Sequence, residues 1–320
     1  MSISSPRPVD GRAAGLMVLL CLCWALQQIL VKAVAADISP MLQIGLRSAM
    51  AAALVLLLMR VQGLRVQARS HWRGALAVGL LFGGEYVMVA EALRRTSAAH
   101  TVVFLYTAPI FAALGLHLRV PTERLRPLQG LGIALAFGGV ALAFLGEPAS
   151  PGASAATDRV GDLLALGGGL AWGATTVVLR GSSLARAPAS EALLYQLMGA
   201  AVLLLGTALA TGQTAVHWTP AVLGGLAFQT VVVAFASFLV WFWLLRHYAA
   251  AMLGVFTFLT PIFGVTLGAW LLDEALAPSF VRGALLVLAG VVMVSAEGPL
   301  RGWLSRRGGR RQAADGAGLG

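Results

Sequence analysis

A single carboxylate stands inside a long apolar run of the chain. Glu85 lies in the stretch LFGGEYVMVAEALRR (81–95), nine residues before Arg94. On a helix that rises 1.5 Å per residue, Glu85 would lie about 13 Å inside the end of the run. A charged residue near the middle of a bilayer costs about 2.5–3.5 kcal/mol on insertion scales, and such residues typically carry function. We therefore expect Glu85 to be a neutral acid, half of an ion pair, or a group that changes its protonation during a cycle.

Arg47 is the expected partner of Glu85. It lies in the preceding apolar run, about 10 Å along a helix that begins near Pro40. The two charges would then lie at similar depth on consecutive antiparallel helices. Two interpretations stay open. Glu85 and Arg47 either form a structural pair that holds the two helices together, or they face a central cavity, where they bind substrate or carry a proton.

Other polar and aromatic residues within apolar runs are weaker candidates. Trp24 and Gln28 share a helix face at the i, i+4 spacing, and Trp172 repeats the tryptophan in the second half of the chain. Aromatic rings in a cavity can receive cations, although packing explains them equally well. The expected substrate-binding or coupling residues are Glu85, Arg47, Trp24, Gln28, Tyr106, Trp172, Tyr195 and Gln229.

Pro109 and Pro261 lie at equivalent positions inside two apolar runs. A proline inside a helix removes a backbone hydrogen bond and kinks the helix. These two residues are expected to bend the chain and contribute to gating. Near the ends of the runs, we expect Glu91, His100 and His117 to lie at the membrane interface.

The elements that position these residues follow from the composition. Of 320 residues, 58% are hydrophobic and 11% are charged, against about 25% charged in soluble domains. A helix needs about 20 apolar residues to cross a bilayer. The sequence predicts an all-α membrane protein with ten transmembrane helices, at residues 13–36, 38–59, 74–93, 98–118, 128–146, 162–179, 192–211, 221–245, 250–272 and 279–296.

The arginines predict the orientation of these helices. With both termini in the cytoplasm, 17 of the 23 basic residues fall on the cytoplasmic side and 5 on the external side, and Arg47 lies within a helix. Cytoplasmic loops are enriched in Lys and Arg. We therefore expect a multi-pass protein of the bacterial cytoplasmic (inner) membrane with both termini in the cytoplasm.

The chain carries one pattern twice. A shift of 148 residues aligns Trp24 with Trp172, and a shift of 152 aligns AAHTVVFLYTAPIF (98–111) with AAMLGVFTFLTPIF (250–263), with seven identities in fourteen. Each unit holds five predicted helices, an odd number, so the second unit would enter the membrane inverted. The expected parts are a cytoplasmic N-terminus (1–12), a first five-helix repeat (13–146), an external linker (147–160), a second five-helix repeat (161–296) and a basic cytoplasmic tail (297–320).

These motifs resemble a known family. The segments TAPIF and LTPIFGVTLGAWLLDEAL, the paired tryptophans and LRRTSAAH resemble the EamA-type transporters of the drug/metabolite transporter superfamily, over residues 13 to 296. The resemblance implies two inverted five-helix repeats and a secondary carrier of small metabolites, often an exporter, that works by alternating access. It implies no cofactor and does not name the substrate.

Several functional alternatives stay open. The substrate is expected to be an amino acid or related metabolite if an acid and a base share the cavity, and proton-coupled efflux of organic cations is the alternative if Arg47 points elsewhere. An intramembrane enzyme or a scaffold is a rival of a different class, although no nucleophile–base set lies at membrane depth. The basic residues form no stripe typical of nucleic-acid binding, and Cys21 and Cys23 are expected to be packing residues rather than metal ligands. Protons are the candidate coupling ion, and assembly as a homodimer stays open.

Overall fold

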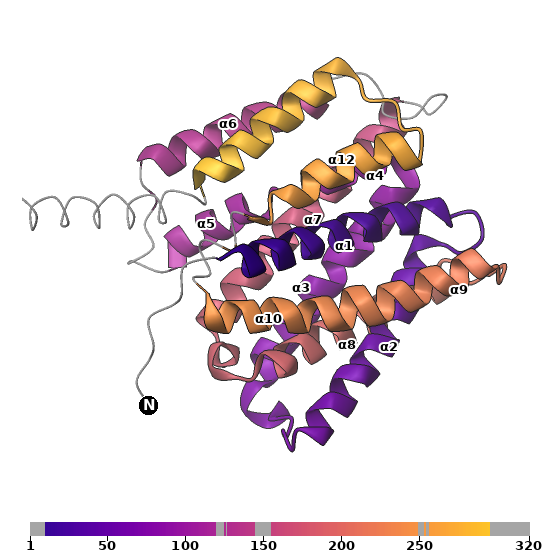
Figure 1. The fold of residues 1–320 in the computed structure, drawn as a ribbon, viewed down its shortest axis with the longest axis vertical. Coiled ribbons are helices and arrows are strands. Elements are labelled where there is room, and N and C mark those ends of the chain that lie inside the picture. Colours follow the sequence, from indigo (N-terminus) through magenta and orange to yellow (C-terminus); the bar gives the residue numbers. More distant parts are fainter. Residues whose placement is uncertain are drawn as a thin grey trace, which may run out of the picture.

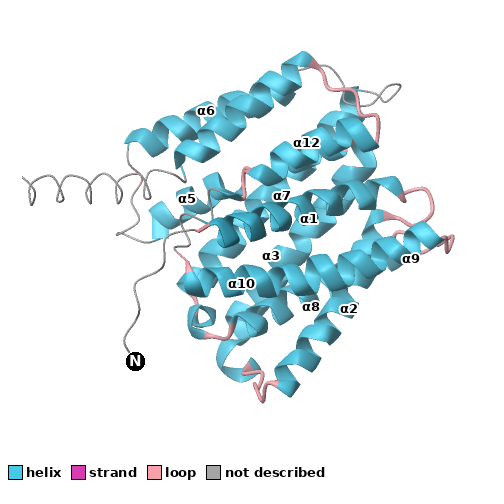
Figure 2. Ribbon diagram, viewed as in Figure 1, coloured by secondary structure: helices cyan, strands magenta, loops and turns pink. Residues whose placement is uncertain are grey.

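The computed structural model describes residues 10–119, 125, 127–144, 155–248, 253 and 256–294, and this part of the chain is helical (Figures 1 and 2). The expected tail at 297–320 lies outside the described residues. The helices run in the order α1 (Gly11–Ala33), α2 (Pro40–Val61), α3 (Ala68–Arg95), α4 (Ala98–Leu105), α5 (Ala108–Arg119), α6 (Pro127–Phe144), α7 (Ala155–Gly181), η2 (Ser183–Arg186), α8 (Ala189–Ala210), α9 (Pro220–Ala227), η3 (Phe228–Ser237), α10 (Phe238–His247) and α12 (Leu259–Leu271), followed by a last helix at Pro278–Val294.

Seven of the described helical segments are long and apolar enough to cross a membrane. Three further apolar helices are shorter than a typical span: Pro127–Ala143, Leu259–Leu271 and Pro278–Val294. The all-helical membrane class predicted from the sequence is therefore confirmed, whereas the count of ten transmembrane helices stays a prediction.

Two of the predicted helices are interrupted in the middle. The segment expected as one helix at 98–118 is two helices, α4 and α5, separated at Tyr106 and Thr107. Pro109 is the second residue of α5. The N–H groups in the first turn of a helix have no partner within the helix, so proline, which lacks an N–H, is tolerated there. A second break precedes α12, in which Pro261 is the third residue. Both prolines thus lie in the first turn after a break.

One continuous helix changes from α-helical to π-helical turns partway along. Residues Pro220–His247 run continuously, but the stretch η3 (Phe228–Ser237) is a π-helix between two α-helical stretches. π-helical turns are rare and are frequently found at functional sites. Three polar residues of η3 are buried: Gln229, Thr230 and Ser237.

The polar contacts between loops define two ends of the bundle. At the first end, Ser39 Oγ donates to the carbonyl of Gln213, and His217 N donates to the carbonyl of Asp37. At the second end, the backbone N–H of Gln67 donates to Glu191. The first end also holds residues 96–97 and 272–277, and the second end holds residues 62–67 and 182–188.

The two halves pack on each other reciprocally. α1 of the first half packs along α12 of the second half, and α7 of the second half packs along α4 and α5 of the first. α6 lies beside the Pro278–Val294 helix (Figure 1). A Cβ on Gly132 would lie 2.8 Å from the carbonyl oxygen of Gly290, and a Cβ on Gly139 would lie 2.6 Å from that of Gly283. These four glycines are equivalent pairs in the internal repeat, so each half offers the same contact to the other.

Candidate functional site

A group of buried polar side chains lies in the middle of the bundle, contributed by both halves. Each has at least one nitrogen or oxygen atom that is buried and makes no hydrogen bond within the part of the chain that the structure describes. Buried polar atoms are nearly always paired in proteins, so such a concentration calls for an explanation. We name this group the central polar layer, and its members are Gln28, Gln43, Arg47, Glu85, Gln229, Thr230 and Thr260.

The helix positions place most of these residues at similar depth, while Gln43, three residues after the start of α2, lies nearer the first end. Gln28 lies five residues before the end of α1, Arg47 seven after the start of α2, and Glu85 ten before the end of α3. At 1.5 Å per residue, these positions are about 8 to 15 Å from the first end of the bundle. Gln229, nine residues after the start of α9, has a comparable depth.

Arg47 is the cation of the layer. Only 3% of it is exposed, and its Nε and Nη1 atoms have no hydrogen-bond partner. Its guanidinium carbon lies 4.8 Å from the centre of the Tyr86 ring, a cation–π contact that covers one face of the group. The ring of Tyr86 packs in turn on Phe82, with ring centres 4.9 Å apart. One face of the guanidinium is therefore covered, while two nitrogens along its edge make no hydrogen bond to any described residue.

Glu85 is the acidic residue of the layer. It is 4% exposed, and its Oε2 atom has no hydrogen-bond partner. Arg47 lies close enough to stabilise the charge of Glu85 electrostatically. Both side chains thus keep atoms that make no hydrogen bond to any described residue.

The break between α4 and α5 brings Tyr106 to the layer. Its hydroxyl is close enough to Glu85 and Tyr86 to interact with them electrostatically. The rings of Tyr106 and Trp172 meet edge to face, with centres 5.1 Å apart. Tyr106 also interacts with Thr260 through its hydroxyl. Two candidates from the sequence, Tyr106 and Trp172, thus contact each other next to the layer.

Neutral amides complete the layer. Gln43 and Gln229 are fully buried, and both amide atoms of each side chain lack hydrogen-bond partners. Gln43 lies one turn before Arg47 on α2, and its Nε2 is 3.6 Å from where a Cβ of Gly225 would be on α9. Since α2 also packs on η3, the amides come from adjoining helices of the two halves.

Apolar side chains cover the layer toward the second end. Ala13, Met17, Leu20 and Cys21 of α1 pack against Leu244, Tyr248 and Leu253, a group we name the second-end cluster. Trp24 lies at its edge, where Nε1 donates to Ser237 Oγ at 2.9 Å and the ring meets Trp241 edge to face at 5.8 Å. Trp24 thus joins α1 to the helix of the second half rather than standing free in the layer.

A second apolar group covers the layer toward the first end. Val34 and Ile38 pack against Val222 and Leu226, and we name these four residues the first-end cluster. Ile38 also pairs with Val216 through the backbone. Along α1, the residues of the second-end cluster come first, Gln28 follows, and the first-end cluster comes last. Along the segment from α9 to α10 the order is reversed, with Gln229 between the two clusters. On these two segments, the polar residues therefore lie between two apolar clusters.

Tyr195 lies apart from the layer. Its hydroxyl donates to Glu191 Oε1 at 2.7 Å, and the same oxygen accepts the backbone N–H of Gln67. Both residues lie in the first two turns of α8, near the second end. Of the residues expected from the sequence, the structure puts Tyr106 in contact with Trp172 and brings Arg47, Glu85 and Tyr106 within electrostatic range. Gln28 and Gln229 lie on adjoining helices, and Trp24 and Tyr195 lie toward the second end.

His100, which was expected near the membrane interface, is buried because the second half of the chain covers it. The side chain is 2% exposed, and its Nδ1 lies 3.0 Å from Asp162 Oδ1. Asp162 also accepts a hydrogen bond from Thr96 Oγ1, and the His100 ring stacks on Phe280 with centres 3.8 Å apart. No signal within one predicted helix could reveal this pair, since its partners are 62 residues apart.

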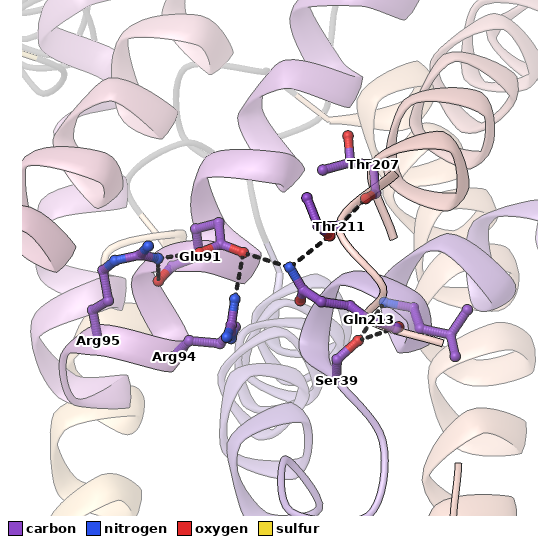
Figure 3. A network of polar contacts seen from close by, with 8 residues as sticks. Ser39, Glu91, Arg94, Arg95, Thr207, Thr211 and Gln213 are labelled. Carbon is purple, nitrogen blue, oxygen red and sulfur yellow. Dashed lines mark hydrogen bonds and ion pairs between the residues drawn. The ribbon is translucent and has the colours of Figure 1, made fainter. Parts of the chain in front are cut away.

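Charged residues at the first end are linked to one another. Glu91 accepts hydrogen bonds from Arg94 and Arg95, and Gln213 Nε2 donates to Glu91 at 3.2 Å (Figure 3). Lys32 Nζ donates to the carbonyls of Leu93 and Thr96, both at 2.6 Å. Glu91 is 17% exposed in this network, as expected for a residue near the helix end rather than in the polar layer.

Sequence reasoning missed Gln43, Tyr86, Thr230 and Thr260. Gln43 is one turn from Arg47 on the same helix face, and Tyr86 directly follows Glu85, so proximity to the two charges was the available signal. The two threonines carry no such signal. Thr260 is recognisable only because the chain breaks just before α12 and brings the residue into the bundle.

Comparisons with known proteins agree with this arrangement. The chain matches the model of the EamA-like transporter family over residues 11–145 and again over residues 159–296. It is 24% identical over 279 residues to the uncharacterized transporter YoaV of Bacillus subtilis, covering 87% of this chain and 94% of that protein. It is 32% identical over 247 residues to the uncharacterized protein PA1977 of Pseudomonas aeruginosa, covering 75% of this chain and 78% of that one. A solved structure described as a crystal structure of a protein shares the fold, with a TM-score of 0.61 and 20% identity, over 93% of this chain and 99% of that chain.

Proposed function

The chain belongs to the EamA-like transporter family, and on that premise we propose that it is a secondary transporter that exports a small polar metabolite across the cytoplasmic membrane by alternating access. The first end of the bundle faces outward in this proposal, and both termini lie in the cytoplasm. Substrate transfer is the activity, with no chemical conversion of the substrate.

One observation carries the proposal: the central polar layer is built by both halves and has unused hydrogen-bonding capacity. α1, α2 and α3 of the first half supply Gln28, Arg47 and Glu85, and the second half supplies Gln229 and Thr260. Polar and ionisable groups at membrane depth are expensive and typically mark the path of a substrate or a proton. A ligand in the layer would supply the missing hydrogen bonds.

The reciprocal packing of the halves supports alternating access. Carriers built from inverted repeats hold their substrate near the midplane, between the repeats, and open to either side as one repeat moves against the other. Here the first-end and second-end clusters lie on either side of the layer along α1 and the α9–α10 segment. Opening the first-end cluster would expose the layer outward, and opening the second-end cluster would expose it to the cytoplasm.

The test is solid-supported-membrane electrophysiology on proteoliposomes, with wild-type protein, Glu85→Gln and Glu91→Gln side by side. Pooled amino acids and then organic cations are applied under a pH gradient. We expect a transient current that is lost in Glu85→Gln and kept in Glu91→Gln, because Glu91 belongs to the loop network at the first end. Full, pH-independent transport by Glu85→Gln would remove Glu85 from the coupling role, and a steady ohmic conductance in wild type would indicate a channel instead.

A further inference from the structure

Two arginines near the second end of the bundle lie over the rings of exposed tryptophans. The guanidinium carbon of Arg12 is 5.8 Å from the centre of the Trp243 ring, and that of Arg73 is 5.2 Å from the centre of the Trp72 ring. We propose that Arg12 and Trp243, which we name the Arg12–Trp243 site, bind the headgroup of an anionic phospholipid in the leaflet at the second end. This lipid is distinct from the transported substrate.

The charges of the two ends favour an anionic ligand at the second end. Near this end, eight exposed arginines are accompanied by two acidic residues, whereas near the first end five basic residues lie among six acidic ones. Basic residues at a membrane surface attract anionic lipids. The second end therefore carries an excess of positive charge that the first end lacks. These counts cover residues 10–12, 60–73, 119 and 180–191 at the second end and residues 32–37, 91–97, 158–162 and 273–282 at the first.

Exposed tryptophans lie at both ends, as is typical of side chains at a membrane interface. Trp218 and Trp270, near the first end, are 60% and 75% exposed. Within the described residues, neither has an arginine over its ring. The combination of an interfacial ring and a guanidinium is therefore a feature of the second end.

Both side chains of the Arg12–Trp243 site offer free donors. Within the part of the chain that the structure describes, the guanidinium of Arg12 makes no hydrogen bond or ion pair, and the indole N–H of Trp243 has no acceptor. Asp10, two residues before Arg12, is engaged elsewhere, because its oxygens accept from the N–H of Ala13 and the hydroxyl of Tyr248. Guanidinium donors match the oxygens of a phosphate group. A phosphate at this site would therefore use hydrogen-bonding capacity that the described residues leave open.

An open apolar face continues from the site along α1. Arg12, Gly15 and Leu19 share one face of the helix, at the spacing i, i+3, i+7. A Cβ on Gly15 would have nothing within 4 Å, and Leu19 is 58% exposed. A soluble anion would contact the donors alone, whereas a phospholipid also places an acyl chain along this face. The arrangement therefore favours a lipid over a free phosphate.

The site joins the two halves of the molecule. Arg12 belongs to α1 of the first half and Trp243 to α10 of the second, and α1 begins beside the end of α10 (Figure 1). Their neighbours in sequence, Ala13 and Leu244, pack in the second-end cluster. His247 supports the indole, with ring centres 4.6 Å apart and Nδ1 donating to the carbonyl of Trp243 at 2.8 Å. A bound headgroup therefore contacts both halves where they meet and stabilises that contact.

The experiment titrates an anionic lipid against the purified full-length protein. The protein is held in mixed micelles of detergent and phosphatidylcholine, in which phosphatidylglycerol replaces phosphatidylcholine in steps. The readout is the unfolding temperature, which rises when a ligand binds the folded state. Wild type is compared with Arg12→Gln and with the matched control Arg186→Gln, which removes an exposed arginine of the same end that lies over no ring of the described residues. Glycerol 3-phosphate at millimolar concentration tests a free phosphate.

We expect phosphatidylglycerol to raise the unfolding temperature of wild type and of Arg186→Gln. Arg12→Gln should need roughly fivefold more phosphatidylglycerol for the same rise, since one basic side chain near the lipid is lost. Glycerol 3-phosphate should have no effect. Equal responses to the two lipids, equal weakening in the two variants, or the full rise with glycerol 3-phosphate overturns the proposal.

A second variant tests the tryptophan. Trp243→Phe keeps a ring beneath Arg12 but removes the N–H donor, so it should also need more phosphatidylglycerol than wild type. Native mass spectrometry of the same samples counts the lipids that stay bound, and the two site variants should retain fewer than wild type and Arg186→Gln. An unchanged titration and an unchanged lipid count in Trp243→Phe would refute a headgroup site shared by the two halves.

Discussion

His100 of α4 and Asp162 of α7 form a buried hydrogen-bonded pair that joins the two halves of the molecule at the first end. The Nδ1 atom of His100 lies 3.0 and 3.1 Å from the two carboxylate oxygens, and both side chains are almost fully buried. Glu274, also from the second half, accepts the backbone N–H groups of Ala98 and Ala99 at the start of α4. The short helix α4 is thus bound through three of its first residues to the half of the chain to which it does not belong.

Replacing Asp162 should destabilise the protein. In Asp162→Ala, the partners His100 and Thr96 lose their acceptor while staying buried, which costs about 1–3 kcal/mol for each group left unsatisfied. Thermal unfolding of the purified protein measures the effect. Asp37→Ala is the control, because Asp37 lies 3.9 Å from the exposed His217 at the same end. Equal unfolding temperatures for the two variants would contradict a structural role of the buried pair.

A methyl group at Gly139 should disturb the contact between α6 and the Pro278–Val294 helix. A Cβ there would lie 2.6 Å from Gly283 O and from Val287 N, and neither backbone atom can move without shifting its helix. Gly139→Ala should therefore cost about 1–3 kcal/mol. The neighbouring Gly138 has nothing within 4 Å of its Cβ position, so Gly138→Ala should be neutral or stabilise by up to about 1 kcal/mol. Comparison of unfolding temperatures decides, and a tolerated Gly139→Ala would argue against the close approach.

The hydrogen bond from Trp24 to Ser237 should be measurable as a coupling between two distant parts of the sequence. Trp24→Phe keeps an aromatic ring beside Trp241 but removes the donor, and Ser237→Ala removes the acceptor. A double-mutant cycle on the free energy of unfolding should give a coupling of about 0.5–1.5 kcal/mol. A coupling of zero would mean that the bond contributes nothing to closing the second end.

The start of α1 should be sensitive to acid. The backbone N–H of Ala13 donates to Asp10 Oδ1 and is the main cause that lowers the pKa of this carboxyl below its ordinary value; Tyr248 donates to the same group. A lowered pKa means that the stabilisation is present above the ordinary value and is lost as the pH falls through the folded one. Hydrogen exchange of residues 11–16, corrected for the intrinsic effect of pH, should accelerate in that acidic range.

Asp10→Asn is the matched variant for this prediction. Asparagine caps helices about as well as aspartate but has no charge to lose, so its exchange at residues 11–16 should not change in the same pH range. An acid-induced change of equal size in Asp10→Asn would assign the effect to another group.

Part of the central polar layer can be predicted from the sequence, because two of its residues stand out within a single apolar run. Glu85 and Arg47 are recognisable as charges in apolar runs, where insertion into the membrane is costly. Gln43 and Tyr86 escape notice because neither glutamine nor tyrosine is unusual in such a run. Their role depends on which helix faces which, and this information is not carried by the hydropathy of one segment.

The structure differs from the predictions made from the sequence where contacts with neighbouring segments determine the helix type, the position of a break or the burial of a side chain. The run at 221–245 has the same apolar pattern whether its turns are α-helical or π-helical, so η3 could not be predicted. The proline positions predicted an interruption near Pro109, but the break lies before the proline, at Tyr106 and Thr107. Burial of His100 required knowing that α7 and the last helix dock on α4.

The enclosure of the polar layer has a consequence for the energy balance of a cell. The first-end and second-end clusters are apolar and pack between α1 and the α9–α10 segment on either side of the layer. While both are closed, apolar side chains lie between Gln28 and each end of the bundle. In the transport cycle proposed above, a carrier resting in this form would be closed to both aqueous compartments, so a cell could keep many idle copies in its membrane without a leak through them.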